Sequence, residues 1–239
     1  MAEDLTLIEK NIKKIFEEAN KYPEANVMAA IKTRSDAEIR KAYDCGIRFF
    51  GENRVQELLE HYECVSSLKD AKLHMIGTLQ TNKVKYIIDK VDMIESLDTL
   101  SLAKEINKRA AAKNIKMKVL VEVNIGREEQ KGGVMPEDLP AFLEALKELE
   151  NITPKGLMTI APVKENPKDY DVYFSEIVSL RDNLFRKVFP NAEKPIVSMG
   201  MSGNYKEALL FGSNMVRLGT EIFGPRPQKN GDLQNLLNQ

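Results

Sequence analysis

Eight short runs of β-forming residues recur along the chain at intervals of about 20 to 40 residues, and this spacing restricts the fold more than any other feature. The runs are apolar on both faces, as in strands buried on both sides, and they occupy 25–32, 47–53, 72–79, 92–97, 117–125, 154–161, 195–201 and 214–220. Segments with helical spacing lie between them. Strands alternating with helices predict a parallel α/β sheet, and eight such units predict a closed (β/α)8 TIM barrel.

An open doubly wound sheet is the alternative, and two observations favour the barrel. The first strand is not followed by a GxGxxG fingerprint, and no composition shift or Pro/Gly/Ser-rich linker divides the chain. We therefore expect a single domain over residues 1–239. It would comprise an extra N-terminal helix in 1–24, the barrel in 25–226 and a loose polar tail in 227–239.

Two of the expected helices have clear starting signals. Ser35 and Glu38 form a capping box, in which each side chain satisfies a free backbone donor of the other residue. The longest segment has Asn166 as its N-cap and Pro167 at its first helical position. Its apolar positions are three to four residues apart, at Phe174, Ile177, Leu180, Leu184 and Val188.

The charges are nearly balanced, with 35 basic and 36 acidic residues and a net charge of −1. No strong field therefore draws the protein to nucleic acid or to a membrane surface. The opening MAEDLTLIEK lacks a basic segment followed by an apolar one, and no apolar run approaches the ~18 residues of a membrane span. We expect a cytoplasmic protein with small or neutral partners. Cys45 and Cys64 lack the spacing of a disulfide framework or a metal site and are interpreted as ordinary thiols.

Lys32 ends the apolar run VMAAIKT, at the carboxyl end of the first strand. A lysine at such a position either extends its ammonium into water or does chemistry, because ligands of α/β barrels bind at the carboxyl ends of the strands. In a closed barrel the first and eighth strands are neighbours. The ends of the seventh and eighth strands, MGMSGN and RLGTEIFG, should therefore lie near Lys32.

These two strand ends combine glycine with hydroxyl residues. Ser202 and Gly203 would open a helix and present free backbone N–H groups to a phosphate. Gly219 allows a close backbone approach, and Thr220 offers a hydroxyl and an N–H to the same anion. The alternative is an ordinary helix cap, but barrels recurrently bind phosphate with the loops after strands seven and eight.

Arg217 lies within the eighth run, and inside a barrel its charge requires a partner. That partner is either a ligand or a buried carboxylate such as Glu122 or Glu95 in a structural ion pair. A lysine beside a phosphate site and an arginine is a candidate for Schiff-base formation. An aldehyde that carries a phosphate suggests pyridoxal 5'-phosphate.

Seven motifs occur in one order along the chain: AAIKT, FGENRVQE, HMIGTLQTNK, VEVNIGREEQKGG, GLMTI, SMGMSGN and MVRLGTEIFGPR. With them the chain resembles, nearly end to end, the pyridoxal phosphate homeostasis proteins, which look like the barrel domain of bacterial alanine racemase standing alone. The resemblance implies an internal aldimine on Lys32 and a pyridine nitrogen approached by Arg217. It also implies further cofactor contacts, to the phosphate from Ser202, Gly219 and Thr220, and around the ring from Asn53 and Met199.

The leading hypothesis is a monomeric carrier that binds pyridoxal phosphate and supports its supply to apo-enzymes, without a reaction of its own. The alternatives are an amino-acid racemase or lyase, and a phosphosugar isomerase or aldolase. The racemase's second domain, which supplies a tyrosine, is not expected here, and His61 and His74 are interpreted as structural or exposed. Residues 127–133, REEQKGG, form either a flexible cover or a solvated loop.

Overall fold

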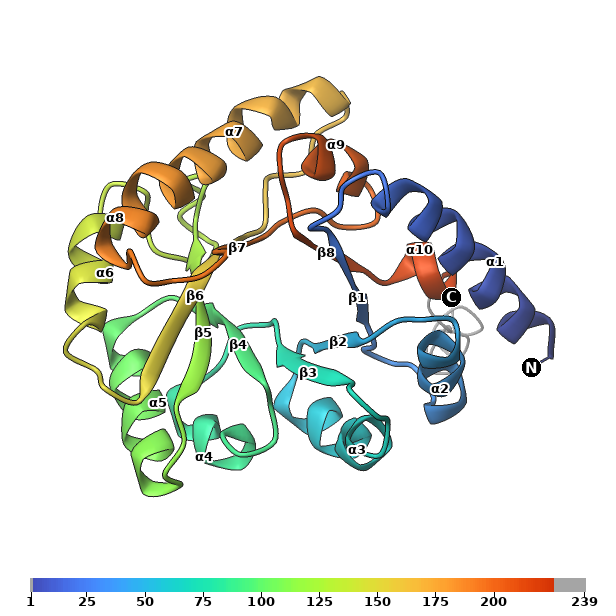
Figure 1. Cartoon of the computed structure of the whole chain (residues 1–239), viewed down its shortest axis with the longest axis horizontal. Coiled ribbons are helices and arrows are strands. Elements are labelled where there is room, and N and C mark those ends of the chain that lie inside the picture. Colours follow the sequence, from blue (N-terminus) through green and yellow to red (C-terminus); the bar gives the residue numbers. More distant parts are fainter. Residues whose placement is uncertain (1, 226–239) are drawn as a thin grey trace, which may run out of the picture.

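The computed structural model describes residues 2–225, in which eight parallel strands close into a barrel surrounded by helices (Figure 1). Each strand pairs with the next, and β1 pairs with β8. The strands are β1 Asn26–Ala30, β2 Phe49–Glu52, β3 Lys72–Met75, β4 Met93–Leu97, β5 Met117–Val123, β6 Ile152–Thr159, β7 Ile196–Ser198 and β8 Met215–Leu218. The predicted (β/α)8 barrel is confirmed, and the open sheet is excluded.

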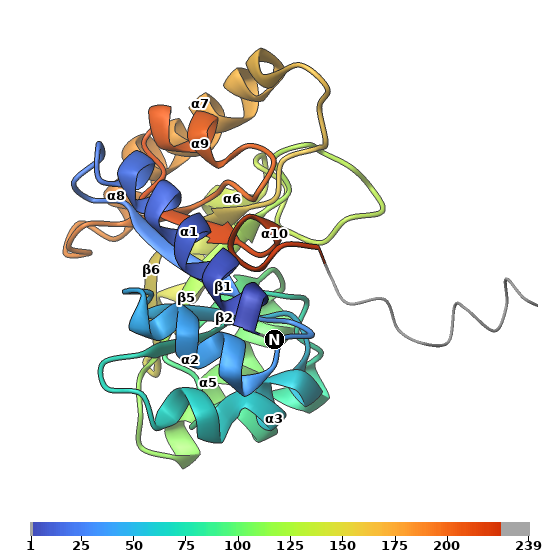
Figure 2. The same ribbon diagram turned by 90° about the vertical axis from the view of Figure 1, so that its right-hand side faces the viewer.

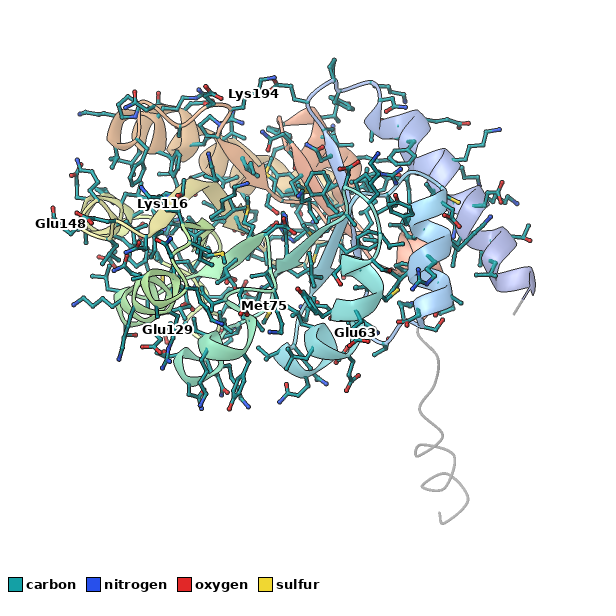
Figure 3. The ribbon with its side chains drawn as sticks, turned by 60° about the horizontal axis from the view of Figure 1, so that its bottom comes forward. Glu63, Met75, Lys116, Glu129, Glu148 and Lys194 are labelled. Carbon is teal, nitrogen blue, oxygen red and sulfur yellow. The ribbon has the colours of Figure 1, made fainter. Side chains whose placement is uncertain are left out.

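Side chains alternate along each strand between the barrel interior and the layer beneath the helices. In β1, Val27 and Ala29 belong to the large core between sheet and helices, whereas Met28 packs inside the barrel with Met215 of β8. In Figure 3, Met75, which is fully buried, lies among the packed elements, while Glu148 lies at the outer surface. The alternation decides which strand-end residues face the barrel mouth.

The helices of the described chain follow the strands, apart from α1, which precedes β1. They are α1 Ala2–Ala19, α2 Asp36–Asp44, α3 Val55–Ser66, α4 Val84–Ile87, α5 Leu100–Ala112, α6 Leu139–Leu146, α7 Asp171–Ser179, α8 Arg186–Val188, α9 Tyr205–Leu210 and α10 Thr220–Phe223. The predicted capping box is present, because the Glu38 carboxylate accepts from the Ser35 N–H and Ser35 Oγ accepts from the Glu38 N–H. No helix of residues 2–225 is long and apolar enough to cross a membrane.

The long segment between β6 and β7 is less regular than its sequence predicts. It begins at Asn166, whose side chain caps a 3-10 turn over Pro167–Tyr170, and continues as α7. A π-helical stretch, Leu180–Phe185, then joins α7 to α8. The wider turn changes which side chain faces inward, so that Phe185 is fully buried while Leu184 is only half-buried.

Helix α1 covers the seam where β8 meets β1, because α10, which follows β8, has a single turn. Figures 1 and 2 show α1 running beside β1, and α1 packs on α2 and α10. Ile8, Ile12 and Ile15 of α1 are each 1% exposed. Asn11 Nδ2 donates to the carbonyl of Ile222 in α10 at 3.1 Å. The expected extra helix is thus present and ends at Ala19; the expected polar tail, 227–239, lies outside the described residues.

We predict that Ile12→Ala lowers the free energy of unfolding by about 2–5 kcal/mol, because it leaves a cavity under α1 at the β8–β1 seam. Leu7→Ala on the same helix is the control, since Leu7 is 41% exposed and should cost much less. Urea unfolding of both variants measures the difference. Equal losses would show that α1 does not seal the barrel.

Candidate functional site

Lys32 lies in a tight turn just beyond β1, and alternation places it in the interior-facing series of Met28 and Ala30. The Arg34 N–H donates to the Ile31 carbonyl at 3.0 Å, which closes the turn around Lys32 and Thr33. Thr33 has φ 63°, an unusual conformation for a β-branched residue, and its N–H donates to Glu57 Oε2 of α3 at 3.0 Å. A strained and anchored turn therefore presents the half-buried Lys32.

Arg34 fixes this turn to the end of α10. Its Nη2 donates to the Gly224 carbonyl at 3.0 Å, and its guanidinium lies 5.1 Å from the centre of the Phe223 ring. Arg34 Nη1 also contacts Glu38 Oε1 at 3.3 Å. The residues after β1 and β8 are consequently held together, as the closure of the barrel requires.

The loops after β7 and β8 meet beside the end of β1. The Glu221 N–H donates to Ser202 Oγ at 3.2 Å, which joins the two loops. A Cβ on Gly219 would lie 3.6 Å from the carbonyl oxygen of Ala30, two residues before Lys32. The structure therefore brings together the two loops for which the sequence predicts a phosphate site, next to the lysine turn.

Backbone donors at these loops are available to an anion. Within residues 2–225, the N–H groups of Ser202, Gly203 and Thr220 form no recorded hydrogen bond, and a Cβ on Gly203 would meet nothing within 4 Å. Helix α9 begins at Tyr205 with Asn204 at its N-cap position, and Ser202 and Gly203 lie in the turn that precedes it. A pocket over these residues is also lined by Lys206 and two glutamates, Glu207 and Glu221. Backbone N–H groups, more than side-chain charge, would attract an anion here.

Arg217 points into the barrel and is 5% exposed. Its Nη1 donates to Ser198 Oγ of β7 at 2.6 Å, and its Nη2 donates to the Thr159 carbonyl of β6 at 2.9 Å. Ser198 Oγ donates in turn to Glu95 Oε2 of β4 at 2.6 Å. The arginine thus reaches Glu95 through a hydroxyl group, and no ion pair recorded among the described residues joins it directly to Glu95 or Glu122.

Glu95 is completely buried, yet it keeps its charge. Burial pushes its pKa upward, but the hydrogen bond and charge of His74, the charge of Arg217 and the Ser198 hydroxyl outweigh burial and lower the pKa. His74 Nδ1 lies 2.7 Å from Glu95 Oε1, and the imidazole ring packs edge-on against Phe49. His74, which we expected to be structural or exposed, is therefore a buried structural partner of Glu95.

Two further carboxyl groups, those of Glu122 and Asp98, lie nearer the barrel mouth. Burial and the nearby Asp98 carboxylate, partly offset by the charge of Arg217, together raise the pKa of Glu122 in β5 to about 7. Burial also raises the pKa of Asp98, against the opposing hydrogen bond from Gly133. Sequence reasoning singled out Glu122 only as a partner for Arg217 and missed Asp98, which directly follows β4.

The loop after β5 rests on this pair. The Asn124 side chain ties the loop to itself, by donating to the Glu128 carbonyl at 2.9 Å and accepting from the Glu128 N–H at 3.1 Å. A Cβ on Gly132 would lie 3.2 Å from Asp98 Oδ2. Residues 127–133 therefore form a tethered loop that is exposed on one side and covers Asp98 on the other. Asn124, which directly follows β5, is the sequence signal that could have indicated this tether.

The two remaining predicted site residues occupy different layers. Asn53 follows β2 in the interior-facing series of Phe49 and Gly51, and its backbone lies so close to Gly77 that a Cβ there would be 2.3 Å from the Asn53 carbonyl oxygen. Met199 directly follows β7, but its side chain is buried in the core between sheet and helices. Alternation thus places the Met199 side chain away from the interior. Its backbone is also engaged, because its N–H donates to the Met215 carbonyl at 3.1 Å and its carbonyl accepts from Ser213 Oγ at 2.8 Å.

The other histidine and both cysteines lie outside this arrangement. His61 Nδ1 of α3 lies 2.7 Å from Glu52 Oε1, beneath the helices, and this contact raises the histidine pKa. Cys45 and Cys64 are unbridged thiols, and burial raises the pKa of each. None of these three side chains faces the barrel mouth.

Comparison with known proteins identifies the family. Residues 4–227 match the family described as alanine racemase, N-terminal domain. A pyridoxal phosphate homeostasis protein of Aquifex aeolicus is 47% identical over 225 residues, which are 94% of this chain and 97% of that relative. The chain belongs to the pyridoxal phosphate homeostasis protein family.

Solved structures of this family and of racemases share the barrel. PipY of Synechococcus elongatus, solved with pyridoxal phosphate (PLP) bound, is 29% identical and superposes with a TM-score of 0.82, over 91% of this chain and all of that one. An alanine racemase of Corynebacterium glutamicum has a TM-score of 0.76 at 17% identity, and the match covers 95% of this chain and 64% of the racemase. The racemase likeness shows the common fold.

The raised pKa of Glu122 predicts a specific pH dependence. The folded chain holds this proton up to about pH 7, whereas the ordinary glutamate pKa is 4.5. The stability of the wild type relative to Glu122→Gln should therefore be greatest below about pH 4.5 and fall as the pH rises through about 7. Urea unfolding of both proteins across this range measures the difference. A difference that does not vary with pH would contradict the prediction, and Glu129→Gln, in the exposed part of the loop after β5, is the control.

Proposed function

We propose that this protein binds PLP at the mouth of its barrel, as an aldimine on Lys32, and serves intracellular PLP homeostasis without a dedicated reaction. The observation that carries the proposal is the meeting, at one end of the barrel, of the anchored Lys32 turn and the two joined loops after β7 and β8. An amine and a group of anion donors at adjacent strand ends match an aldehyde that carries a phosphate. The names of the relatives, and the PLP-bound PipY structure, support the same ligand.

The residues fit such a ligand in chemistry and in space. The N–H groups of Ser202, Gly203 and Thr220, with two hydroxyls, suit a phosphate, and the glycines leave room for its approach. Gly219 provides space beside Ala30. Asn53 would lie beside the ring through its interior-facing position, whereas Met199 would only shape the strand end, since its side chain faces the helices and its backbone groups are paired.

Arg217 supports a carrier over a catalyst. A guanidinium group donates hydrogen bonds and has no acceptor, so beside the pyridine nitrogen it would leave that nitrogen unprotonated. PLP supplies an electron sink for reactions at bound amino acids, and an unprotonated ring is a weak one. The match to 97% of the Aquifex relative also favours this role over that of a racemase or lyase. We further propose a cytoplasmic monomer that supplies PLP to apo-enzymes.

We predict that the purified protein with PLP shows an aldimine absorption band near the visible edge, and that Lys32→Ala abolishes it. Borohydride should fix the cofactor on the peptide that contains Lys32, which mass mapping identifies. Lys83→Ala, which removes a lysine after β3, should retain the band. Reduction onto Lys83 or Lys131 in the wild type would show that the lysine assignment is wrong.

Removing both hydroxyls from the phosphate loops should weaken PLP retention. In Ser202→Ala/Thr220→Ala the backbone donors remain, but two hydrogen bonds to a charged group are lost, each worth ~1.5–3 kcal/mol. Equilibrium dialysis of the variant measures the dissociation constant, and Ser175→Ala on the exposed side of α7 is the control. An unchanged constant in the double variant would exclude these loops as the phosphate site.

A further inference from the structure

A continuous chain of hydrogen bonds crosses the barrel interior from β3 to β8. It runs from His74 Nδ1 to Glu95 Oε1 at 2.7 Å, from Glu95 Oε2 to Ser198 Oγ at 2.6 Å, and from Ser198 Oγ to Arg217 Nη1 at 2.6 Å. All four residues are at most 5% exposed. Burying charged groups costs desolvation free energy, so such a network is stable only when every group has a hydrogen-bond partner. Each of these four residues has one.

The donor and acceptor roles in this series of hydrogen bonds are fixed by its two charged residues, Glu95 and Arg217. A carboxylate only accepts hydrogen bonds and a guanidinium only donates them. The Ser198 hydroxyl must therefore donate its proton to Glu95 and accept from Arg217, and His74 must donate from Nδ1. Reversing any one bond would leave two acceptors or two donors facing each other.

We propose that His74, Glu95 and Ser198 are positioning residues of the cofactor site, which hold the Arg217 guanidinium in place against the ligand. The inference rests on the proposed function, because it assigns these residues a role toward bound PLP. Ser198 separates Arg217 from Glu95 by one hydroxyl group and so prevents a direct ion pair. The Thr159 carbonyl fixes a second edge of the guanidinium.

Removal of the hydroxyl should change where Arg217 lies. In Ser198→Ala the guanidinium and the Glu95 carboxylate face each other across the space of the lost oxygen, and their attraction draws Arg217 toward β4. Its remaining donors then move away from the ligand. The pyridine nitrogen of PLP would lose its neighbouring cation, and protonation of that nitrogen would become more favourable.

The test compares Ser198→Ala with Ser198→Thr, which keeps the hydroxyl, and with Ser213→Ala. Ser213 is a buried serine whose hydroxyl contacts backbone carbonyls at the ends of β7 and β8, outside the chain of charges. With ¹⁵N-labelled PLP, Ser198→Ala should move the ring-nitrogen resonance toward the protonated form and raise the dissociation constant by about tenfold or more. The threonine variant and Ser213→Ala should keep the wild-type resonance.

A second pair of variants changes His74, at the other end of this series of hydrogen bonds. His74→Phe removes the donor to Glu95 and should move the same resonance in the same direction, whereas His74→Asn offers an amide N–H near the position of Nδ1 and should restore it. His74 lies in β3, which β1 and β2 separate from the β8 strand of Arg217, so a merely local packing defect would not reproduce this pattern.

The outcomes separate the inference from the proposed function. An unchanged resonance and dissociation constant in Ser198→Ala and His74→Phe, with PLP still attached to Lys32, would overturn the positioning role and leave the carrier function standing. A wild type that binds no PLP would overturn the carrier function. In that case the guanidinium ¹⁵N signals of Arg217 in the PLP-free proteins would still report its position, and identical signals in wild type and Ser198→Ala would overturn the positioning role as well.

Discussion

The pairing of β1 with β8 is the interaction on which the candidate site depends. Its register sets Met28 opposite Arg217 and Ala29 opposite Leu218, so the lysine turn after β1 lies beside the loops after β7 and β8, for which we propose phosphate binding. The strands alone would leave this seam exposed, because α10 has only one turn. The amphipathic α1 supplies the missing cover, and barrel closure and site assembly are therefore the same structural event.

Apolar and charged side chains share the barrel interior. Met28 and Met215 pack in an apolar cluster with Ile76, whereas Arg217, Glu95 and His74 are joined through Ser198 by hydrogen bonds. An apolar replacement of similar volume would avoid the desolvation cost of these charges, so stability does not explain their presence. The proposed role of Arg217 beside a bound ligand would explain it, since such a guanidinium must remain ordered before the ligand arrives.

The barrel and the positions of its strands could be predicted from sequence because their signals are local: apolar runs, caps and regular spacing. Strand adjacency then placed Lys32 near Ser202 and Thr220 without knowledge of any contact. The chain from His74 to Arg217 could not be predicted, because its members come from four strands and its bonds depend on side-chain direction and depth. Two other features could not be predicted for a similar reason: the π-helical stretch that buries Phe185 and the outward-facing side chain of Met199. In each case a shift of one residue reverses the direction of a side chain.

The cover that α1 provides has a consequence for folding. Helix α1 precedes β1 in the chain and packs against α10, which follows β8, and Asn11 donates a hydrogen bond to Ile222 across this contact. Contacts between distant parts of a sequence form late and slowly, because the intervening chain must first be ordered. During synthesis α1 therefore carries an unsatisfied apolar face until β8 emerges. The last strand then completes the sheet, the seam cover and the ligand mouth in one cooperative step.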